Sequence, residues 1–176
     1  AEVGINHNGS LKNAKKYIDI LKKIDVDIVK FQIAVPENVT SIHAKKSKYQ
    51  INKKGESQLE MISKYHLNVS ENLDLIDYAK KNKVRLMFSA FDQDSLKIIL
   101  ENKYIKDIKI PSGEITNYQL LNMISKSNKK LFMSTGMSNI TEIKKAIETI
   151  TNGNLSKYKN NFLLQCTSSY PTQLKD

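Results

Sequence analysis

KIPSGEITN, at residues 109–117, joins the end of a short apolar strand to a small polar turn. Lys109 stands on the strand, and a serine, a glycine and a glutamate follow it in the turn. Loops after strand ends are where α/β folds place binding and catalytic side chains. A lysine, a hydroxyl and a carboxylate together can hold an anion and move a proton. The plainer interpretation is a strand-to-helix loop in which Asn117 caps the helix.

Strand-like and helix-like segments alternate on both sides of this stretch. Short apolar segments predict six strands, at 1–5, 27–32, 85–89, 107–111, 130–134 and 162–165. Apolar residues at three- and four-residue steps predict helices at 11–24, 71–82, 93–102, 117–127 and 140–151. The inward faces of the first two helices are expected to hold Leu11, Ala14, Ile18, Leu21 and Ile24, and Leu73, Ile76 and Ala79.

This order predicts a parallel sheet, because strand–helix–strand repeats connect parallel neighbours. An open doubly wound sheet and a (β/α)8 TIM barrel compete. The sequence has no glycine-rich nucleotide-binding signature, and polar residues recur at the strand ends, as at a barrel mouth. These residues are Asn6, Lys30, Gln32, Ser89, Lys109, Ser112, Ser134 and Thr167. About six of the eight βα units are visible, so we expect residues 1–176 to be an incomplete catalytic barrel from a longer protein.

One interval breaks the repeat. Residues 33–70 are polar and rich in lysine, with Pro36 near the start and a short helix predicted near 57–64. Loops of this length are usually functional or disordered. We therefore expect residues 36–70 to form a loop and a short helix over the barrel mouth, and not another βα unit.

The composition of the chain limits which kinds of binding partner, such as nucleic acid or a membrane, are expected. The net charge is +10, but the lysines are spread along the helices and Arg85 is the only arginine. Specific base readout relies on arginine, so we expect solvated helix faces and no nucleic-acid partner. No apolar run is long enough to cross a membrane, and the first residues lack a signal-peptide pattern. The single Cys166 suits a reducing compartment, so we expect a cytoplasmic protein.

The strand-end lysines are the main candidates for chemistry. A lysine near a barrel interior needs a partner, because burying an unpaired charge is costly. An anionic substrate could be that partner, and Lys30 and Lys109 are then expected to converge on one anion site. The alternative is that they pair with Glu2 or Glu114 and bind nothing. Further hydrogen bonds are expected from Ser112, Ser134 and the backbone NH groups around Gly113 and Gly136.

The histidines and the cysteine give a weaker signal. His7 follows a strand, a plausible site position, whereas His43 and His66 are expected to be exposed and structural. No pair of histidines has metal-ligand spacing, so the sequence predicts no metal site within these residues. Cys166 is interpreted as a small buried thiol and not as a nucleophile.

Six short motifs follow one another along the chain. They are AEVGINHNG (1–9), DIVKFQ (27–32), SAFD (89–92), KIPSGEITN (109–117), STGM (134–137) and QCTSSYPT (165–172). Their order and spacing resemble those of the sialic acid (N-acetylneuraminate) synthase family, the nonulosonic acid synthases. The stretch KSKYQ (46–50) is also similar to the family's excursion after its second strand. Members of this family condense phosphoenolpyruvate with an N-acylated amino sugar.

The resemblance implies a barrel enzyme with a divided site. Phosphoenolpyruvate would be held by Lys30, Lys109 and Ser112, in a pocket completed by Ser89, Ser134, Ser168 and Tyr170. The amino sugar would contact Gln32, Glu114 and Tyr170. Glu2 matches an acidic position of the opening motif and joins Lys109 and Glu114 as a catalytic candidate.

The implied reaction joins C3 of phosphoenolpyruvate to the aldehyde of the open-chain sugar, adds water to C2 and releases phosphate. A divalent metal, Mn²⁺ or Mg²⁺, polarises the aldehyde in the family, but the histidine motifs that hold it are not in this chain. The family's C-terminal antifreeze-like domain, which reaches into the partner's site of a homodimer, is also absent. We therefore expect residues 1–176 alone to be catalytically silent.

Other interpretations remain open. Lys109 could be the nucleophile of a Schiff-base aldolase. The domain could also be a non-catalytic anion-binding barrel, which Gln165 slightly favours because many family members carry His there. Within the resemblance, both N-acetylmannosamine and a diacetamido hexose, the precursor of legionaminate, remain possible substrates.

Overall fold

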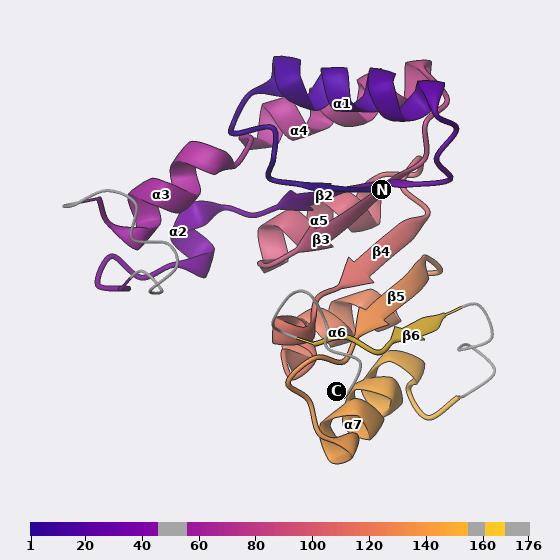
Figure 1. Ribbon diagram of the computed structural model, residues 1–176. Coiled ribbons are helices and arrows are strands. Elements are labelled where there is room, and N and C mark those ends of the chain that lie inside the picture. The colour runs from indigo at the N-terminus through magenta and orange to yellow at the C-terminus, as the bar shows by residue number, and fades with distance from the viewer. Residues whose placement is uncertain (46–55, 155–160, 168–176) are drawn as a thin grey trace. The chain divides into compact units, whose positions relative to one another are not determined.

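A computed structural model describes residues 1–45, 56–154 and 161–167 (Figure 1). The chain divides into two compact units, residues 1–95 and 96–176, each described by itself. The first unit contains β1 (Glu2–Gly4), α1 (Leu11–Lys23), β2 (Val29–Ile33), α2 (Pro36–Val39), α3 (Gln58–Tyr65), α4 (Val69–Lys81) and β3 (Leu86–Ala90). The second contains β4 (Asp107–Ile110), a 3₁₀ turn η2 (Ser112–Glu114), α6 (Tyr118–Ser125), β5 (Lys130–Ser134), α7 (Ile140–Thr151) and β6 (Phe162–Leu164). Helix α5 (Gln93–Glu101) crosses the boundary.

The sheet of the first unit is parallel, in the order β1–β2–β3. Its register sets Glu2 against Lys30 and Gln32 against Ser89. Neighbours in register share one face of a sheet, so these four polar side chains lie on the same face. The alternate residues of β2, including the fully buried Phe31, belong to the apolar core.

Helices α1 and α4 lie side by side in the first unit (Figure 1). Ser10 caps α1 by accepting a hydrogen bond from the Asn13 amide, and Asn68 forms a capping box with Glu71 at the start of α4. The buried helix residues include Ala14 and Ile18 of α1 and Leu75, Ile76 and Ala79 of α4.

Two apolar residues predicted to face inward do not. Ile24 is 66% exposed because it follows the last residue of α1 and has left the helix face. Leu73 is 43% exposed because the buried face of α4 is set by Asn72, Leu75, Ile76 and Ala79.

The predicted excursion is confirmed where it is described. Residues 36–45 and 56–70 contain α2, α3 and the start of α4, with no strand. Gly9 fixes the opening loop against this segment, because a Cβ at its positive φ of 69° would lie 2.2 Å from the Lys64 carbonyl oxygen. The motif at 46–50 lies outside the described residues, and the position of the excursion over a barrel mouth stays a prediction.

The second unit repeats the pattern, with β4, β5 and β6 parallel. The register sets Lys109 against Phe132 and Ser134 against Leu164. Leu131 and Met133 are buried on the other face of β5, and α6 and α7 pack against each other. Among the described residues, no helix is long and apolar enough to span a membrane.

Candidate functional site

The first polar group surrounds Lys30 on one face of β1, β2 and β3, and is here called the Lys30 cluster (Glu2, Lys30, Gln32 and Ser89). Lys30 was predicted at a strand end, but β2 begins at Val29, so Lys30 is its second residue. Glu2 begins β1, whereas Gln32 and Ser89 lie near the ends of β2 and β3. The Lys30 ammonium lies 2.6 Å from Glu2 Oε2 and donates a hydrogen bond to Ser89 Oγ at 3.3 Å. Gln32 joins them, since a Cβ built on Gly4 would meet Glu2 Oε1 at 3.1 Å and Gln32 Nε2 at 3.6 Å. The sequence therefore identified residues that do lie together in this unit.

The Lys30 ion pair joins a mostly buried cation to a more exposed anion. The Lys30 side chain is 15% exposed and the Glu2 side chain 55%. The expectation that Glu2 could be the partner of Lys30 is confirmed. Because an ammonium has three donors and Glu2 can turn toward water, an incoming anion could share or replace this contact.

The second polar group is the Lys109 cluster (Lys109, Ser112, Ser134, Gly136 and Cys166). The Lys109 ammonium donates to Ser134 Oγ at 2.5 Å and to the Ile110 carbonyl oxygen at 3.1 Å. Ser134 is buried, and its Oγ lies 3.2 Å from Cys166 Sγ. Contacts from β4 to β5, and from β5 to the segment after β6, thus connect three parts of the sequence.

Gly136 shows how closely these loops pack. A Cβ at this position would lie 3.1 Å from Ser112 Oγ and 3.2 Å from the Cys166 carbonyl oxygen. The loops after β4, β5 and β6 therefore meet at Gly136, which places Ser112 and Cys166 at the same end of this unit as Ser134. The sequence predicted the serines here, but not the contact of Cys166, which is half-buried and not fully buried as expected.

Glu114 is held by a local hydrogen bond. It ends the η2 turn and accepts a hydrogen bond from Asn117 Nδ2 at 2.8 Å. Asn117 also caps α6 by accepting from the Leu120 amide at 3.3 Å. The helix-capping role predicted for Asn117 is thus confirmed, and the same side chain orients the carboxylate of the candidate proton carrier.

Some predicted contacts remain predictions. Ser168 and Tyr170 lie outside the described residues. Lys30 belongs to the first unit and Lys109 to the second, so their convergence on one anion is likewise a prediction.

His7 is not part of either cluster. It is 1% exposed, and its ring lies 6.1 Å from the buried Phe31 ring, centroid to centroid. Burial lowers the pKa of His7, nearby His66 lowers it further, and Glu71 opposes the shift. The position after a strand made His7 a plausible site residue in the sequence, but the structure buries the side chain beside a core residue.

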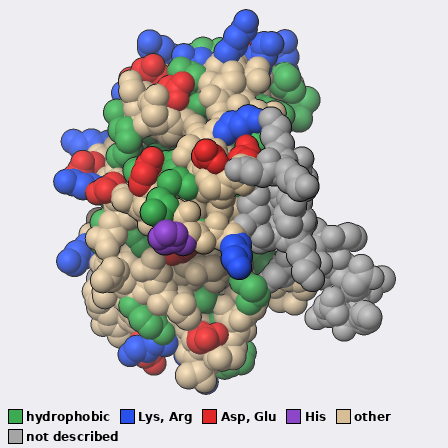
Figure 2. Space-filling model, turned by 90° about the vertical axis from the view of Figure 1, so that its left-hand side faces the viewer, with side chains coloured by type: hydrophobic (Ala, Val, Ile, Leu, Met, Phe, Trp, Pro, Cys, Tyr) green, Lys and Arg blue, Asp and Glu red, His purple; other side chains and the backbone are tan. Residues whose placement is uncertain are grey.

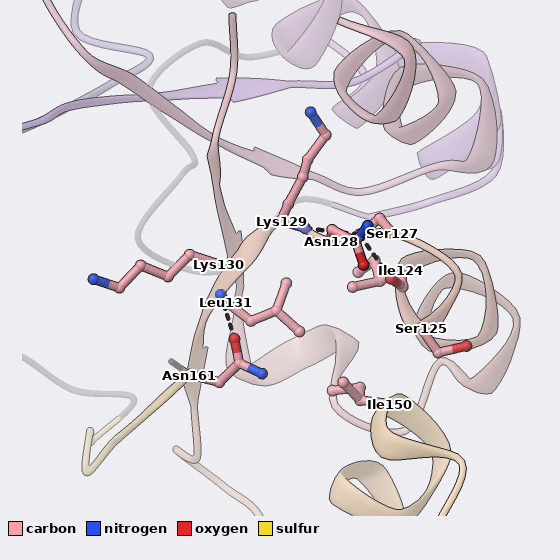
Figure 3. Close-up of a pocket in the computed structure, with 9 residues that line it drawn as sticks. All are labelled: Ile124, Ser125, Ser127, Asn128, Lys129, Lys130, Leu131, Ile150 and Asn161. Atoms are coloured by element: carbon pink, nitrogen blue, oxygen red, sulfur yellow. Dashed lines mark hydrogen bonds between the residues drawn. The ribbon is translucent and has the colours of Figure 1, made fainter. Parts of the chain in front are cut away.

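A cavity of about 440 Å³ opens at the other end of the second unit (Figure 3). It lies where β5 begins, and its lining includes Leu131, Ile150 and Asn161. Asn161 Oδ1 accepts a hydrogen bond from the Leu131 amide at 2.8 Å, while the Lys130 side chain extends away from the other labelled residues (Figure 3). Parallel α/β folds carry their chemistry at the carboxyl ends of the strands, so this cavity is not the candidate site.

The distribution of charge agrees with solvated helix faces. Figure 2 shows Lys and Arg side chains scattered over the face that it draws, among acidic and uncharged residues.

Among residues 1–45, 56–154 and 161–167, no group of three or more His, Cys, Asp and Glu side chains is arranged to hold a metal ion. The described residues thus do not by themselves fit a divalent metal.

Comparison with known proteins gives a consistent result. A model of the NeuB family matches residues 17–176. N,N'-diacetyllegionaminic acid synthase of Campylobacter jejuni is 42% identical over 178 residues, which cover 100% of this chain and 53% of that protein. The corresponding synthase of Legionella pneumophila is 35% identical over 181 residues, which cover 100% of this chain and 50% of that protein. The chain spans about half the length of the curated relatives it matches.

Solved structures confirm the fold class. A sialic acid synthetase from Leptospira borgpetersenii, solved with citrate, has a TM-score of 0.79 and 26% identity, covering 100% of this chain and 56% of that one. A DAHP synthase from Thermotoga maritima, at 15% identity and a TM-score of 0.60, covers 93% of this chain and 40% of that one and shows the fold alone. The six successive strands therefore belong to part of a (β/α)8 barrel, as predicted.

Proposed function

This chain belongs to the NeuB family, and we propose that the full-length protein condenses phosphoenolpyruvate with an N-acylated amino sugar. The product would be a nonulosonic acid, and inorganic phosphate would be released. The names of the relatives support this proposal, because they are synthases of diacetyllegionaminic, pseudaminic and neuraminic acids. The enzyme would be a transferase of sialic acid-type carbohydrate biosynthesis.

The observation that carries the proposal is the contact between Lys109 and Ser134. The two residues come from separate motifs, yet their side chains meet at the carboxyl ends of β4 and β5. A lysine beside a hydroxyl is suited to a phosphate or carboxylate, since both donate hydrogen bonds to anionic oxygens. The Lys30 cluster offers a second cation with the neighbouring Ser89.

The proposed chemistry assigns roles to the chain's own residues. C3 of phosphoenolpyruvate bonds to the aldehyde carbon of the open-chain sugar, water adds to C2, and phosphate leaves by cleavage of its C–O bond. Lys30 and Lys109 would neutralise the phosphate and carboxylate charges throughout. Glu114, oriented by Asn117, would contact the sugar and carry a proton, while Gln32 would contact the sugar.

The sugar is proposed to be a diacetamido hexose and not N-acetylmannosamine. Identity reaches 42% and 35% with the two diacetyllegionaminic acid synthases. It is 31% and 29% with N-acetylneuraminate-9-phosphate synthases of Drosophila melanogaster and Homo sapiens, whose named product carries a phosphate that N-acetylmannosamine would not supply. Comparing the two sugars at equal concentration tests this choice.

Metal, oligomer and location are further parts of the proposal. A divalent metal, Mn²⁺ or Mg²⁺, would polarise the aldehyde when bound, with ligands outside residues 1–176. A homodimer in the cytoplasm, without membrane or nucleic-acid partner, fits the same family resemblance.

The test is phosphate release by the full-length protein from phosphoenolpyruvate and each sugar, with the product identified by NMR. Release that requires both substrates, together with a nonulosonic acid, is the expected result. If pyruvate and borohydride instead inactivate the protein by trapping Lys109, a Schiff-base aldolase replaces this proposal. If phosphoenolpyruvate binds but no sugar gives turnover, a non-catalytic anion-binding barrel replaces the proposed condensation.

A further inference from the structure

Ser134 is the centre of a three-member contact chain in the second unit. Its buried hydroxyl receives a hydrogen bond from the Lys109 ammonium and lies 3.2 Å from Cys166 Sγ. The backbone of Cys166 is held by the loop after β5, because a Cβ on Gly136 would come within 3.2 Å of its carbonyl oxygen. The position of the thiol is therefore fixed from both its side chain and its backbone.

The hydrogen-bonding capacity of a hydroxyl gives this contact a role. A serine hydroxyl has one hydrogen and two lone pairs. Lys109 occupies one lone pair, and a thiol hydrogen donated by Cys166 would occupy the other. The serine hydrogen is then available to an oxygen of an anion beside Lys109. Because a thiol is a weak donor and acceptor, it competes little with that anion.

We propose that Cys166 is a positioning residue for phosphoenolpyruvate: its thiol orients the Ser134 hydroxyl so that Ser134 and Lys109 donate together to one anionic group. The inference rests on the proposed function. It differs from a packing role, because it requires a group at residue 166 that can hydrogen-bond to Ser134. It also makes the half-buried thiol a neighbour of the bound anion.

The kinetic test compares two variants of the full-length protein. Cys166→Val keeps an apolar side chain but cannot hydrogen-bond, and Cys166→Ser keeps a donor. We expect Cys166→Val to raise the KM for phosphoenolpyruvate about fivefold to tenfold, the equivalent of one hydrogen bond. The KM for the amino sugar should be unchanged. Cys166→Ser should recover most of the affinity, whereas a packing role predicts that Val is tolerated and Ser is not.

A matched control in the same unit is Ser125→Ala. Ser125 is buried, and its hydroxyl donates to the Asn122 carbonyl oxygen within α6, away from the Lys109 cluster. This variant should leave the KM for phosphoenolpyruvate unchanged, which separates the loss of one hydroxyl contact in the fold from the loss of the positioning contact.

A second measurement needs no variant. Cys166 is the only cysteine in this sequence, and its alkylation by iodoacetamide can be followed by mass spectrometry of the peptide that contains it. Phosphoenolpyruvate at about ten times its KM should slow alkylation about tenfold by mass action, and inorganic phosphate should also protect. The amino sugar alone should not.

The outcomes distinguish the two proposals. No turnover by the wild-type protein overturns the proposed function and this inference with it. Turnover with unchanged KM in Cys166→Val, or with alkylation unaffected by phosphoenolpyruvate, overturns the inference alone. If the variants do not fold, the alkylation result on the wild-type protein decides.

Discussion

The Lys30 and Lys109 clusters hold their lysines by different means. Lys30 is ion-paired with Glu2, whose carboxylate is more than half exposed, and also contacts Ser89. Lys109 donates to the buried Ser134 hydroxyl and to the Ile110 carbonyl, both from strand residues. The first lysine has a charged partner that can turn into water, and the second donates to two neutral oxygens fixed by the sheet.

Because of this difference, the two lysines should contribute unequally to the binding of phosphoenolpyruvate. An anion that binds Lys30 must compete with the Glu2 carboxylate, so part of the interaction energy offsets the weakened ion pair. An anion that binds Lys109 adds to contacts with neutral oxygens, and Ser134 can donate to the same anion. We therefore expect the Lys109 cluster to contribute more to phosphoenolpyruvate binding.

The largest expected effect comes from removing each cation in the full-length protein. Lys109→Met should lower kcat/KM for phosphoenolpyruvate. The loss of transition-state stabilisation should be about 2–5 kcal/mol, as expected for a lost charge contact. Lys30→Met should cost less, because Glu2 is then released to water. Steady-state kinetics measures both, and a larger loss in Lys30→Met would reverse the comparison.

Lys130→Met is the control for these variants. Lys130 lies on β5, but its ammonium is 4.7 Å from the centre of the Phe162 ring. Its replacement should change stability by no more than about 1 kcal/mol and leave the KM for phosphoenolpyruvate unchanged.

A smaller effect is expected from crowding at the Lys109 cluster. Gly136→Ala would press a methyl group on Ser112 Oγ and the Cys166 carbonyl oxygen, which should cost about 1–3 kcal/mol of stability. Gly113→Ala is the matched control, since a Cβ there meets no atom of the described residues within 4 Å. Thermal unfolding of both variants measures the difference, and equal melting temperatures would show that the strand-end loops yield easily.

The smallest expected effect is a loss of folding stability at acidic pH, caused by the buried His7 of the first unit. Burial holds the pKa of His7 below its ordinary value of 6.5, so the unfolded chain binds a proton more readily than the folded chain. Stability from this site is full above pH 6.5 and falls as the pH drops below it. Urea unfolding at about pH 5 and about pH 8 should show a loss in the wild type that is smaller in His7→Phe.

His43→Gln is the control for acid sensitivity, because His43 is exposed. This variant should keep the acid sensitivity of the wild-type protein. If His7→Phe also keeps this acid sensitivity, another group causes the loss of stability at low pH. The buried histidine would then not explain the acid sensitivity of the first unit.

Local patterns in the sequence predict most of the fold. Lys130–Ser134 and Ile140–Thr151 match β5 and α7, because apolar spacing and flanking polar residues mark them clearly. The short α2 and the η2 turn were not predicted, since a single turn has no periodicity to detect. Ile24 was misplaced for a related reason: spacing does not show at which residue a helix ends.

The members of the two polar clusters were predictable from the sequence, but not all of their contacts were. The contact of Lys109 with Ser134 follows from polar positions at strand ends, whereas the contact of Lys30 with Ser89 depends on the register of β2 and β3. The contact of Cys166 with Ser134 depends on the alignment of β5 with β6 and on the loops that follow. The burial of His7 was not predictable, because chain position does not reveal toward which side a loop turns its side chain.

The close approach of Gly9 to Lys64 has a consequence for how this protein can evolve. A side chain at residue 9 would collide with the Lys64 backbone, and backbone atoms cannot be exchanged by substitution. The amino acid at position 64 is free to change, but the path of its main chain is not. A lineage that replaces Gly9 must also reshape the segment around α3, so the opening loop and that segment can diverge only together.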